Sequence, residues 1–127
     1  MIFGIGNDII QCERMEQLRL KFGEDLLKKI LTPAEQMLAA NRKNQTEFLA
    51  GRWAAKEALA KALGCGLGEF CSLQDVEILP DSMKRPVITL HGKALETANR
   101  AGISKIHLSI SHERNYAVAM VVLETAD

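Results

Sequence analysis

One segment of 18 residues, TEFLAGRWAAKEALAKAL (46–63), constrains the fold more than any other part of the chain. It is dominated by alanine, leucine, lysine and glutamate, which have high helix propensities. We expect Thr46 to cap this helix and Gly64 to end it. At about 100° per residue, the large apolar residues fall on one stripe and the small residues on another face suited to close packing. The stripe contains Phe48, Leu49, Leu59 and Leu63, and the small-residue face contains Gly51, Ala54, Ala55, Ala58 and Ala62.

Four charged residues of this helix leave alternatives open. Arg52 and Lys56 lie within the apolar stripe. Their stems either cover apolar surface while their heads reach water, or their charges meet an anionic ligand or a partner chain. Glu57 and Lys61 lie on a third side, and their spacing of four residues favours an exposed ion pair.

The rest of the chain predicts an α+β fold. Helical patterns cover 13–30, with a break or end at Gly23, then a segment that starts at Thr32-Pro33-Ala34-Glu35 with a capping box, and 93–101. Strand-like segments cover 2–10, 76–79, 87–90, 105–111 and 116–123. Hairpins rather than alternating βαβ units connect the late strands, and 105–123 is predicted to be one hairpin. We therefore expect a largely antiparallel sheet with a long central helix, in a single domain spanning 1–127.

Charge and cysteine content exclude several classes of protein. Sixteen Lys and Arg balance sixteen Asp and Glu, so no net positive field favours nucleic acid or a membrane surface. No window approaches the roughly 20 apolar residues of a membrane span, and the N-terminus lacks the basic start of a signal peptide. The three cysteines (Cys12, Cys65 and Cys71) form no CxxC pair. Reduced thiols in a cytoplasmic protein that binds neither nucleic acid nor membrane are therefore expected.

Three sets of residues are candidates for chemistry. Asp8 lies late in a glycine-rich strand, where it either forms a turn or pairs with Glu57 to hold a hard cation such as Mg²⁺. The loop Gly64-Cys65-Gly66-Leu67-Gly68 follows a helix rather than preceding one, so it is not a Walker loop or a dinucleotide fingerprint. It is either a mobile exit from the helix or a set of amides that meets a phosphate near Lys61. His112, beside Ser111 and Arg114, is either a solvated turn residue or a phosphate ligand.

Three motifs together resemble one enzyme family. They are IGNDI at 5–9, FLAGRWAAKEALAKALG at 48–64 and LSISHE at 108–113. The set is similar to the holo-acyl-carrier-protein synthases, the short type of the 4′-phosphopantetheinyl transferase family. The resemblance covers essentially the whole chain, in the family's order and length, and its central motif is highly specific.

The resemblance implies a reaction and a set of roles. The phosphopantetheine arm of coenzyme A would be moved to a serine of acyl carrier protein, releasing adenosine 3′,5′-bisphosphate, as in fatty acid biosynthesis. Asp8 and Glu57 would be catalytic carboxylates that ligate Mg²⁺, and Lys61 would steady the phosphoryl or leaving oxygens or act as a general acid. The base would be either a metal-held water assisted by a carboxylate or a carboxylate itself.

The resemblance also implies where coenzyme A and the carrier protein bind. The coenzyme A contacts would come from Arg52, Gly64, Gly66, Arg85, Pro86, Ser111 and His112. Arg85 stands where the family usually has glycine before Pro86, which puts adenine contacts there in doubt, whereas Cys65, in place of the usual Thr or Ser, is expected to be tolerated. The family works as a homotrimer with active sites between neighbouring subunits. Basic residues of the first helices, with Arg14 foremost, would dock an acidic carrier protein; the others are Arg19, Lys21, Lys28 and Lys29.

Overall fold

Five strands and five α-helices follow one another in the predicted order, with the helical pattern over 13–30 divided into two helices at Gly23. The computed structural model describes all 127 residues. The elements are β1 (Ile2–Gln11), α1 (Cys12–Phe22), α2 (Glu24–Ile30), α3 (Pro33–Ala40), α4 (Gln45–Leu63), the short 3₁₀ helix η1 (Leu73–Asp75), β2 (Val76–Pro80), β3 (Pro86–Leu90), α5 (Gly92–Arg100), β4 (Ile103–His112) and β5 (Tyr116–Thr125). The predicted α+β class with a long central helix is confirmed.

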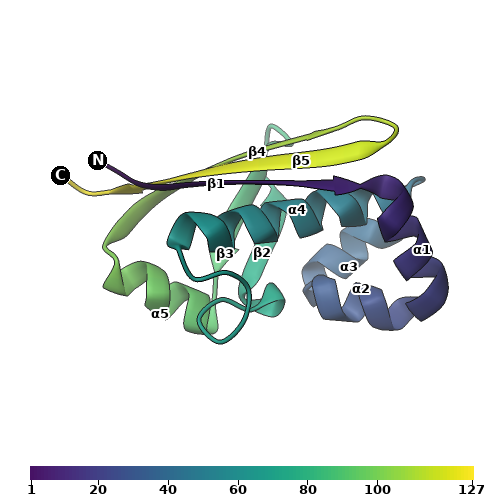
Figure 1. Cartoon of the computed structure of the whole chain (residues 1–127), viewed down its shortest axis with the longest axis horizontal. Helices are drawn as coiled ribbons and strands as arrows, with labels where there is room; N and C mark the ends of the chain where they lie inside the picture. The colour runs from purple at the N-terminus through teal and green to yellow at the C-terminus, as the bar shows by residue number, and fades with distance from the viewer.

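The strands form two antiparallel sheets rather than one. The larger sheet has the order β1-β5-β4, with β5 in the centre, and β2 pairs only with β3. The three-stranded sheet covers one side of α4, while the β2–β3 hairpin and helices α1 to α3 lie on its other side (Figure 1). Both termini meet at one end of the sheet, where the Met1 amino group lies 2.9 Å from Asp127 Oδ1.

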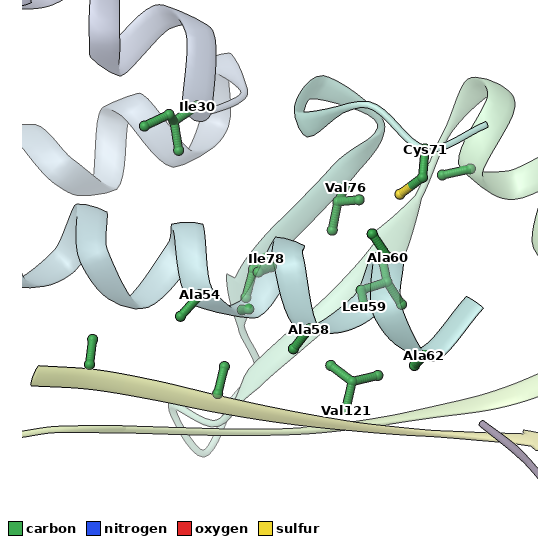
Figure 2. Close-up of a cluster of buried hydrophobic side chains, with 14 of the residues drawn as sticks. Ile30, Ala54, Ala58, Leu59, Ala60, Ala62, Cys71, Val76, Ile78 and Val121 are labelled. Atoms are coloured by element: carbon green, nitrogen blue, oxygen red, sulfur yellow. The ribbon is translucent and has the colours of Figure 1, made fainter. Parts of the chain in front are cut away.

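Helix α4 forms the centre of the hydrophobic core. Its alanines Ala54, Ala58 and Ala62 face the larger sheet, on the side of Val121 (Figure 2). Its opposite side faces the β2 hairpin. The residues drawn there are Leu59, Ala60, Cys71, Val76 and Ile78, all of which are fully buried (Figure 2). Small residues on the sheet side allow the helix axis to lie close to the strands.

Two glycines of β1 make that approach possible. A Cβ atom built on Gly6 would lie 1.9 Å from the carbonyl oxygen of Ala58, and one built on Gly4 would lie 2.1 Å from that of Ala62. Any side chain at either position would therefore collide with the backbone of α4. Glycines within a strand often mark such a close approach of another backbone. Strand β1 thereby brings Asp8 alongside the C-terminal half of α4.

The helix boundaries agree with local sequence rules, with one correction. Gly23, at φ 57°, separates α1 from α2, and Thr32 and Glu35 form the predicted capping box at the start of α3. Helix α4, however, begins one residue earlier than predicted. Its cap is Asn44, whose Oδ1 accepts a 2.9 Å hydrogen bond from the Glu47 amide. Thr46 lies inside the first turn, where its hydroxyl accepts a hydrogen bond from Arg19 Nε instead.

The two cations of the apolar stripe do not extend into water. Lys56 is fully buried and Arg52 is only 8% exposed, so the water-exposed alternative is wrong. Lys56 Nζ lies 2.6 Å from Glu35 Oε1, a residue of α3. The Arg52 guanidinium lies 4.5 Å from the ring centre of Phe48, one helical turn earlier. No helix combines the length and apolar character needed to cross a bilayer.

Candidate active site

The site begins where β1 passes the C-terminal half of α4. Lys61 Nζ donates hydrogen bonds of 3.0 Å to Asp8 Oδ1 and of 3.0 Å to the carbonyl oxygen of Asn7. The predicted exposed ion pair between Glu57 and Lys61 does not form, because Lys61 reaches across to the strand instead. A helical spacing of four cannot reveal this, since the competing partner lies 53 residues away in the chain.

Glu57 shares this site with Asp8. Burial raises the pKa of Glu57, the negative charge of Asp8 raises it further, and the Lys61 ammonium partly offsets both. Both carboxylates line the same cavity. That the two acids hold one cation together stays a prediction.

A cavity of about 600 Å³ opens next to these three side chains. Its charged lining comes from Asp8, Arg14, Asp25, Lys29, Glu57 and Lys61. Its apolar lining comes from Ile9, Ile10, Met15, Leu18, Phe22, Leu26, Ile30, Trp53 and Leu73. A mostly apolar cavity with a few charged groups at one place is typical of a small-molecule or substrate-arm site.

The donor set fits Mg²⁺ better than a transition metal. No group of three or more His, Cys, Asp or Glu side chains is placed to surround an ion. Mg²⁺ commonly takes only one or two carboxylates and completes its shell with water and substrate phosphates. Asp8 and Glu57 can supply those two carboxylates, and the open cavity beside them leaves room for the other ligands.

The basic residues of the first helices separate into two groups. Arg14 and Lys29 line the cavity, so their charges lie at its edge. Arg19 is already engaged within the fold, by a 3.0 Å ion pair with Glu16 and the hydrogen bond to Thr46. Lys21 lies over the ring of Phe22, 5.2 Å from its centre.

Arg52, Ser111 and His112 lie at the other half of α4. Ser111 and His112 are exposed at the end of β4, and His112 Nδ1 contacts Glu47 in the first turn of α4. The Nε atom of Arg52 is buried and has no hydrogen-bond partner, and burial lowers the pKa of this guanidinium to about 10. None of these three residues lines the cavity that holds Asp8 and Glu57.

The glycine loop closes the helix instead of presenting free amides. Gly64, at φ 85°, is the C-cap of α4 as predicted, and the amides of Gly64, Cys65 and Gly66 all donate to the carbonyl oxygen of Ala60. The amide of Gly68 donates to Cys71. The alternative in which these amides meet a phosphate is therefore not supported.

Arg85 and Pro86 lie away from the cavity, at the start of β3. Arg85 pairs with Asp81 in the β2–β3 turn, with 3.2 Å between Nε and Oδ2. The backbone of Lys84 has φ 66°, so the left-handed residue of this turn comes one position before Arg85.

Sequence reasoning missed most of the cavity lining and one buried pair. Asp25 and Leu73 line the cavity, but neither belongs to a motif. Glu35 was expected only as part of the capping box, yet its carboxylate also binds Lys56. The signal available for that pair was the position of Lys56 in an apolar stripe, which requires a partner once the stripe is buried.

Comparison with known proteins shows which family the chain resembles. Residues 4–121 match the model of the 4′-phosphopantetheinyl transferase superfamily. The chain is 45% identical to a holo-[acyl-carrier-protein] synthase of Vibrio cholerae, with 98% of each chain covered. It is 41% identical to the enzyme of the same name from Syntrophus aciditrophicus, covering 98% of this chain and 97% of the relative.

Solved structures show the same fold. The holo-[acyl-carrier-protein] synthase of Neisseria meningitidis superimposes with a TM-score of 0.93 at 36% identity, over 98% of this chain and 100% of that one. The synthase of Bacillus anthracis, solved in complex with CoA (3′,5′-ADP), gives a TM-score of 0.84 at 41% identity, over 99% of both chains. Because the family model and the relatives cover nearly the whole chain, the protein belongs to the 4′-phosphopantetheinyl transferase superfamily.

Proposed function

We propose that this protein transfers the 4′-phosphopantetheine group of coenzyme A to a serine of apo-acyl carrier protein, with Mg²⁺, and releases adenosine 3′,5′-bisphosphate. The observation that carries the proposal is the meeting of Asp8 and Lys61 beside Glu57 at one cavity. The printed names of the relatives and the coenzyme A complexes of the Bacillus anthracis and Helicobacter pylori synthases support the choice of substrates.

Each residue of the site has a role in this reaction. Asp8 and Glu57 would hold the cation, which when bound neutralises the pyrophosphate charge that grows during phosphoryl transfer. Lys61, half exposed and held by Asp8 and Asn7, points its ammonium group into the same space. It would stabilise the phosphoryl or leaving oxygens by charge, or donate a proton to the leaving group. The serine proton would pass either to a carboxylate or to water oriented by one.

The coenzyme A site is proposed to lie between two copies of the chain, in a homotrimer. Arg52 and Glu57 are five residues apart on one helix, so their side chains point about 140° away from each other. In a single chain, one ligand could therefore not easily contact both groups of residues. One group is Arg52, Ser111 and His112, and the other is Asp8 and Glu57. A neighbouring copy removes that difficulty, and the exposed apolar face of the larger sheet is available to bind it.

That face is formed by alternate residues of two paired strands. Ile5 and Ile9 of β1 are 61% and 63% exposed, and Val118 and Met120 of β5 are 39% and 47% exposed. Strand register places Ile9 opposite Val118, so the residues form one continuous apolar surface. The likeness to the family, together with this surface, supports three copies. The odd number of unpaired cysteines agrees with a cytoplasmic location.

The carrier protein is proposed to dock on α1 and α2 at the mouth of the cavity. Arg14 and Lys29 line the cavity and carry the charge that an acidic partner would meet. Arg19 and Lys21 lie on the same helix as Arg14 but have neighbours within the fold, so we expect them to contribute less.

A mass measurement tests the proposal directly. The purified protein is incubated with apo-acyl carrier protein, coenzyme A and Mg²⁺, and we expect the carrier protein to gain the mass of phosphopantetheine. Asp8→Ala and Glu57→Ala should abolish this gain while the far-ultraviolet circular dichroism stays unchanged. Glu69→Ala, a change at an exposed glutamate in the 64–72 loop, is the matched control and should keep full activity. Coenzyme A binding without any mass gain would instead indicate a binding module.

A further inference from the structure

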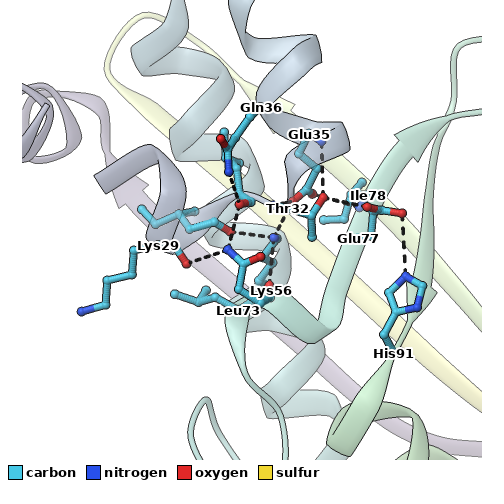
Figure 3. Close-up of polar contacts among 12 residues, drawn as sticks. Lys29, Thr32, Glu35, Gln36, Lys56, Leu73, Glu77, Ile78 and His91 are labelled. Carbon is cyan, nitrogen blue, oxygen red and sulfur yellow. Dashed lines mark hydrogen bonds and ion pairs between the residues drawn. The ribbon is translucent and has the colours of Figure 1, made fainter. Parts of the chain in front are cut away.

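Lys56 and Glu35 form a fully buried ion pair that the proposed chemistry does not use. Lys56 Nζ donates to Glu35 Oε1 at 2.6 Å, to the carbonyl oxygen of Ile30 at 2.7 Å and to that of Leu73 at 3.0 Å. These three bonds use all the donors of the ammonium group. The side chains converge from separate parts of the chain (Figure 3).

The carboxylate of Glu35 is satisfied in the same way. Its Oε1 also accepts a 2.8 Å hydrogen bond from the Thr32 amide, and its Oε2 accepts one of 2.9 Å from the Ile78 amide. The network therefore joins the end of α2, the start of α3, the middle of α4, η1 and β2. Burial lowers the pKa of Lys56, and the charge and hydrogen bond of Glu35 partly offset that effect.

Stability alone does not account for such a pair. Taking both charges out of water costs more than packing two apolar side chains of similar volume, and apolar replacement of a buried ion pair is often neutral or stabilising. Unlike apolar side chains, the pair directs hydrogen bonds to particular carbonyl groups. Those carbonyl groups indicate its role.

Two of the three acceptors belong to the wall of the active-site cavity. Ile30 and Leu73 both line that cavity, and Lys56 directly precedes Glu57 on α4. Gln74, the neighbour of Leu73, adds further bonds from its Nε2 atom, of 2.7 Å to the carbonyl oxygen of Lys28 and of 2.8 Å to that of Leu31. Side chains of α4 and η1 thus hold the C-terminal end of α2, the helix that brings Lys29 to the cavity edge.

We propose that Lys56 and Glu35 are positioning residues for the transfer reaction, which fix the α2 wall of the cavity relative to Glu57 and so set how the acidic carrier protein is presented. The inference rests on the proposed function and names a part of the carrier site within it. Neither residue touches the substrates. Their effect passes through the positions of Ile30 and Leu73, and through Lys29 on the same helix.

Steady-state kinetics with each substrate varied in turn tests this role. The variants are Lys56→Met and the double variant Glu35→Leu/Lys56→Met, which replaces both charges by apolar groups and leaves no buried charge behind. We expect the KM for carrier protein to rise about tenfold and kcat/KM to fall between about 10- and 100-fold, because a displacement of about 1 Å costs up to that much. The KM for coenzyme A should stay within about twofold.

The control removes a Lys–Glu ion pair that does not line the cavity. Lys93 and Glu96 of α5 form an exposed pair, with 3.5 Å between Nζ and Oε2, and Lys93→Met/Glu96→Leu should leave both KM values unchanged. All assays are run well below the melting temperature of each variant. If Lys56→Met and the double variant do not fold, Glu35→Gln, which keeps the side-chain volume, is judged by the same criteria.

The outcomes separate this inference from the proposed function. A folded variant with an unchanged KM for carrier protein, or with equal changes for both substrates, would refute the positioning role while leaving the transferase assignment intact. A wild-type protein that transfers nothing would refute the proposed function, and this inference with it.

Discussion

The two faces of the larger sheet differ sharply, although both are apolar. Along β5, Ala117, Ala119, Val121 and Leu123 point inward and are buried, whereas Tyr116, Val118 and Met120 point outward and are exposed. The inward residues are small on average, and α4 covers them closely. The outward residues are larger, and no part of this chain covers them. Close packing on the inner face brings Asp8 next to Lys61, while the outer face is the proposed interface with a second copy.

The first prediction concerns a substitution that disrupts the close packing of the inner face. In Gly6→Val, the new Cβ would lie 1.9 Å from the carbonyl oxygen of Ala58, which is backbone and cannot move away cheaply. We expect a loss of about 3 kcal/mol or more in the free energy of unfolding. The matched change on the outer face is Asn7→Val, at an exposed neighbouring position. It should alter stability by no more than about 0.5 kcal/mol.

Urea denaturation followed by circular dichroism measures both variants. Equal stabilities for Gly6→Val and Asn7→Val would contradict the close approach of β1 to α4. That approach also brings Asp8 to Lys61, so any folded Gly6→Val protein should have lost its transferase activity as well.

The second prediction concerns a substitution that adds a charge to the outer face. Met120→Glu places a carboxylate in the middle of the exposed apolar surface, where an isolated chain tolerates it but an assembled interface does not. We expect the protein to sediment as a monomer and to lose transfer activity by at least about tenfold. Met37→Glu, at a residue of α3 that is 73% exposed, is the control and should change neither property.

Analytical ultracentrifugation decides between these outcomes. A Met120→Glu protein with the same sedimentation coefficient as the wild type would show that this face is not the interface. Full activity in a monomeric variant would contradict a coenzyme A site shared between copies.

The third prediction concerns the cavity that the inner packing creates. Arg14→Glu reverses a charge at the cavity edge, so we expect the KM for carrier protein to rise about tenfold, with the KM for coenzyme A nearly unchanged. The same reversal at Arg19, which is engaged by Glu16 and Thr46, should raise the KM for carrier protein by a smaller factor. Increasing salt should reduce the difference between Arg14→Glu and wild type. Equal effects on both substrates would contradict the docking assignment.

Local features of the fold could be predicted from the sequence, whereas contacts between residues far apart in the chain could not. The central helix, the Thr32–Glu35 capping box and the hairpin at 105–123 follow local rules, and the structure has all of them. Glycines within a strand, such as Gly4 and Gly6, are typical of a close approach by another backbone, but they do not indicate which one. Family resemblance, rather than spacing, indicated that Asp8 and Glu57 belong together.

The errors all involve a partner far away in the chain. Lys61 was expected to pair with Glu57 but binds Asp8. Lys56 was expected to reach water or to meet an anionic ligand or a partner chain, but it binds Glu35. Thr46 was expected to cap α4, but Asn44 does so, because the Thr46 hydroxyl interacts with residues of α1. Helical spacing gives the direction of a side chain, while tertiary packing decides which of several charges it meets.

The smallest expected effect concerns the free-energy cost of the ionised Glu57 carboxylate in the folded protein. Burial and the nearby Asp8 raise the pKa of Glu57 in the folded protein above its ordinary value of 4.5. Between these two pKa values the native state binds more protons than the unfolded state, so stability falls as pH rises through this window. Glu57→Gln removes that cost, and without added metal it should melt above the wild type at pH 7 by less than about 4 °C.

The pH dependence of this difference identifies its cause. The advantage of Glu57→Gln should be largest above the raised pKa and should vanish below pH 4.5, where both side chains are neutral. Thermal melts in EDTA across pH 4 to 8 measure it, with the exposed Glu69→Gln as a control that should follow the wild type at every pH. A difference that does not vary with pH would point to packing, and a less stable Glu57→Gln at pH 7 would contradict the repulsion between the two carboxylates. If the advantage disappears when Mg²⁺ is added, the cation compensates the cost of placing two acids at the edge of a tightly packed core.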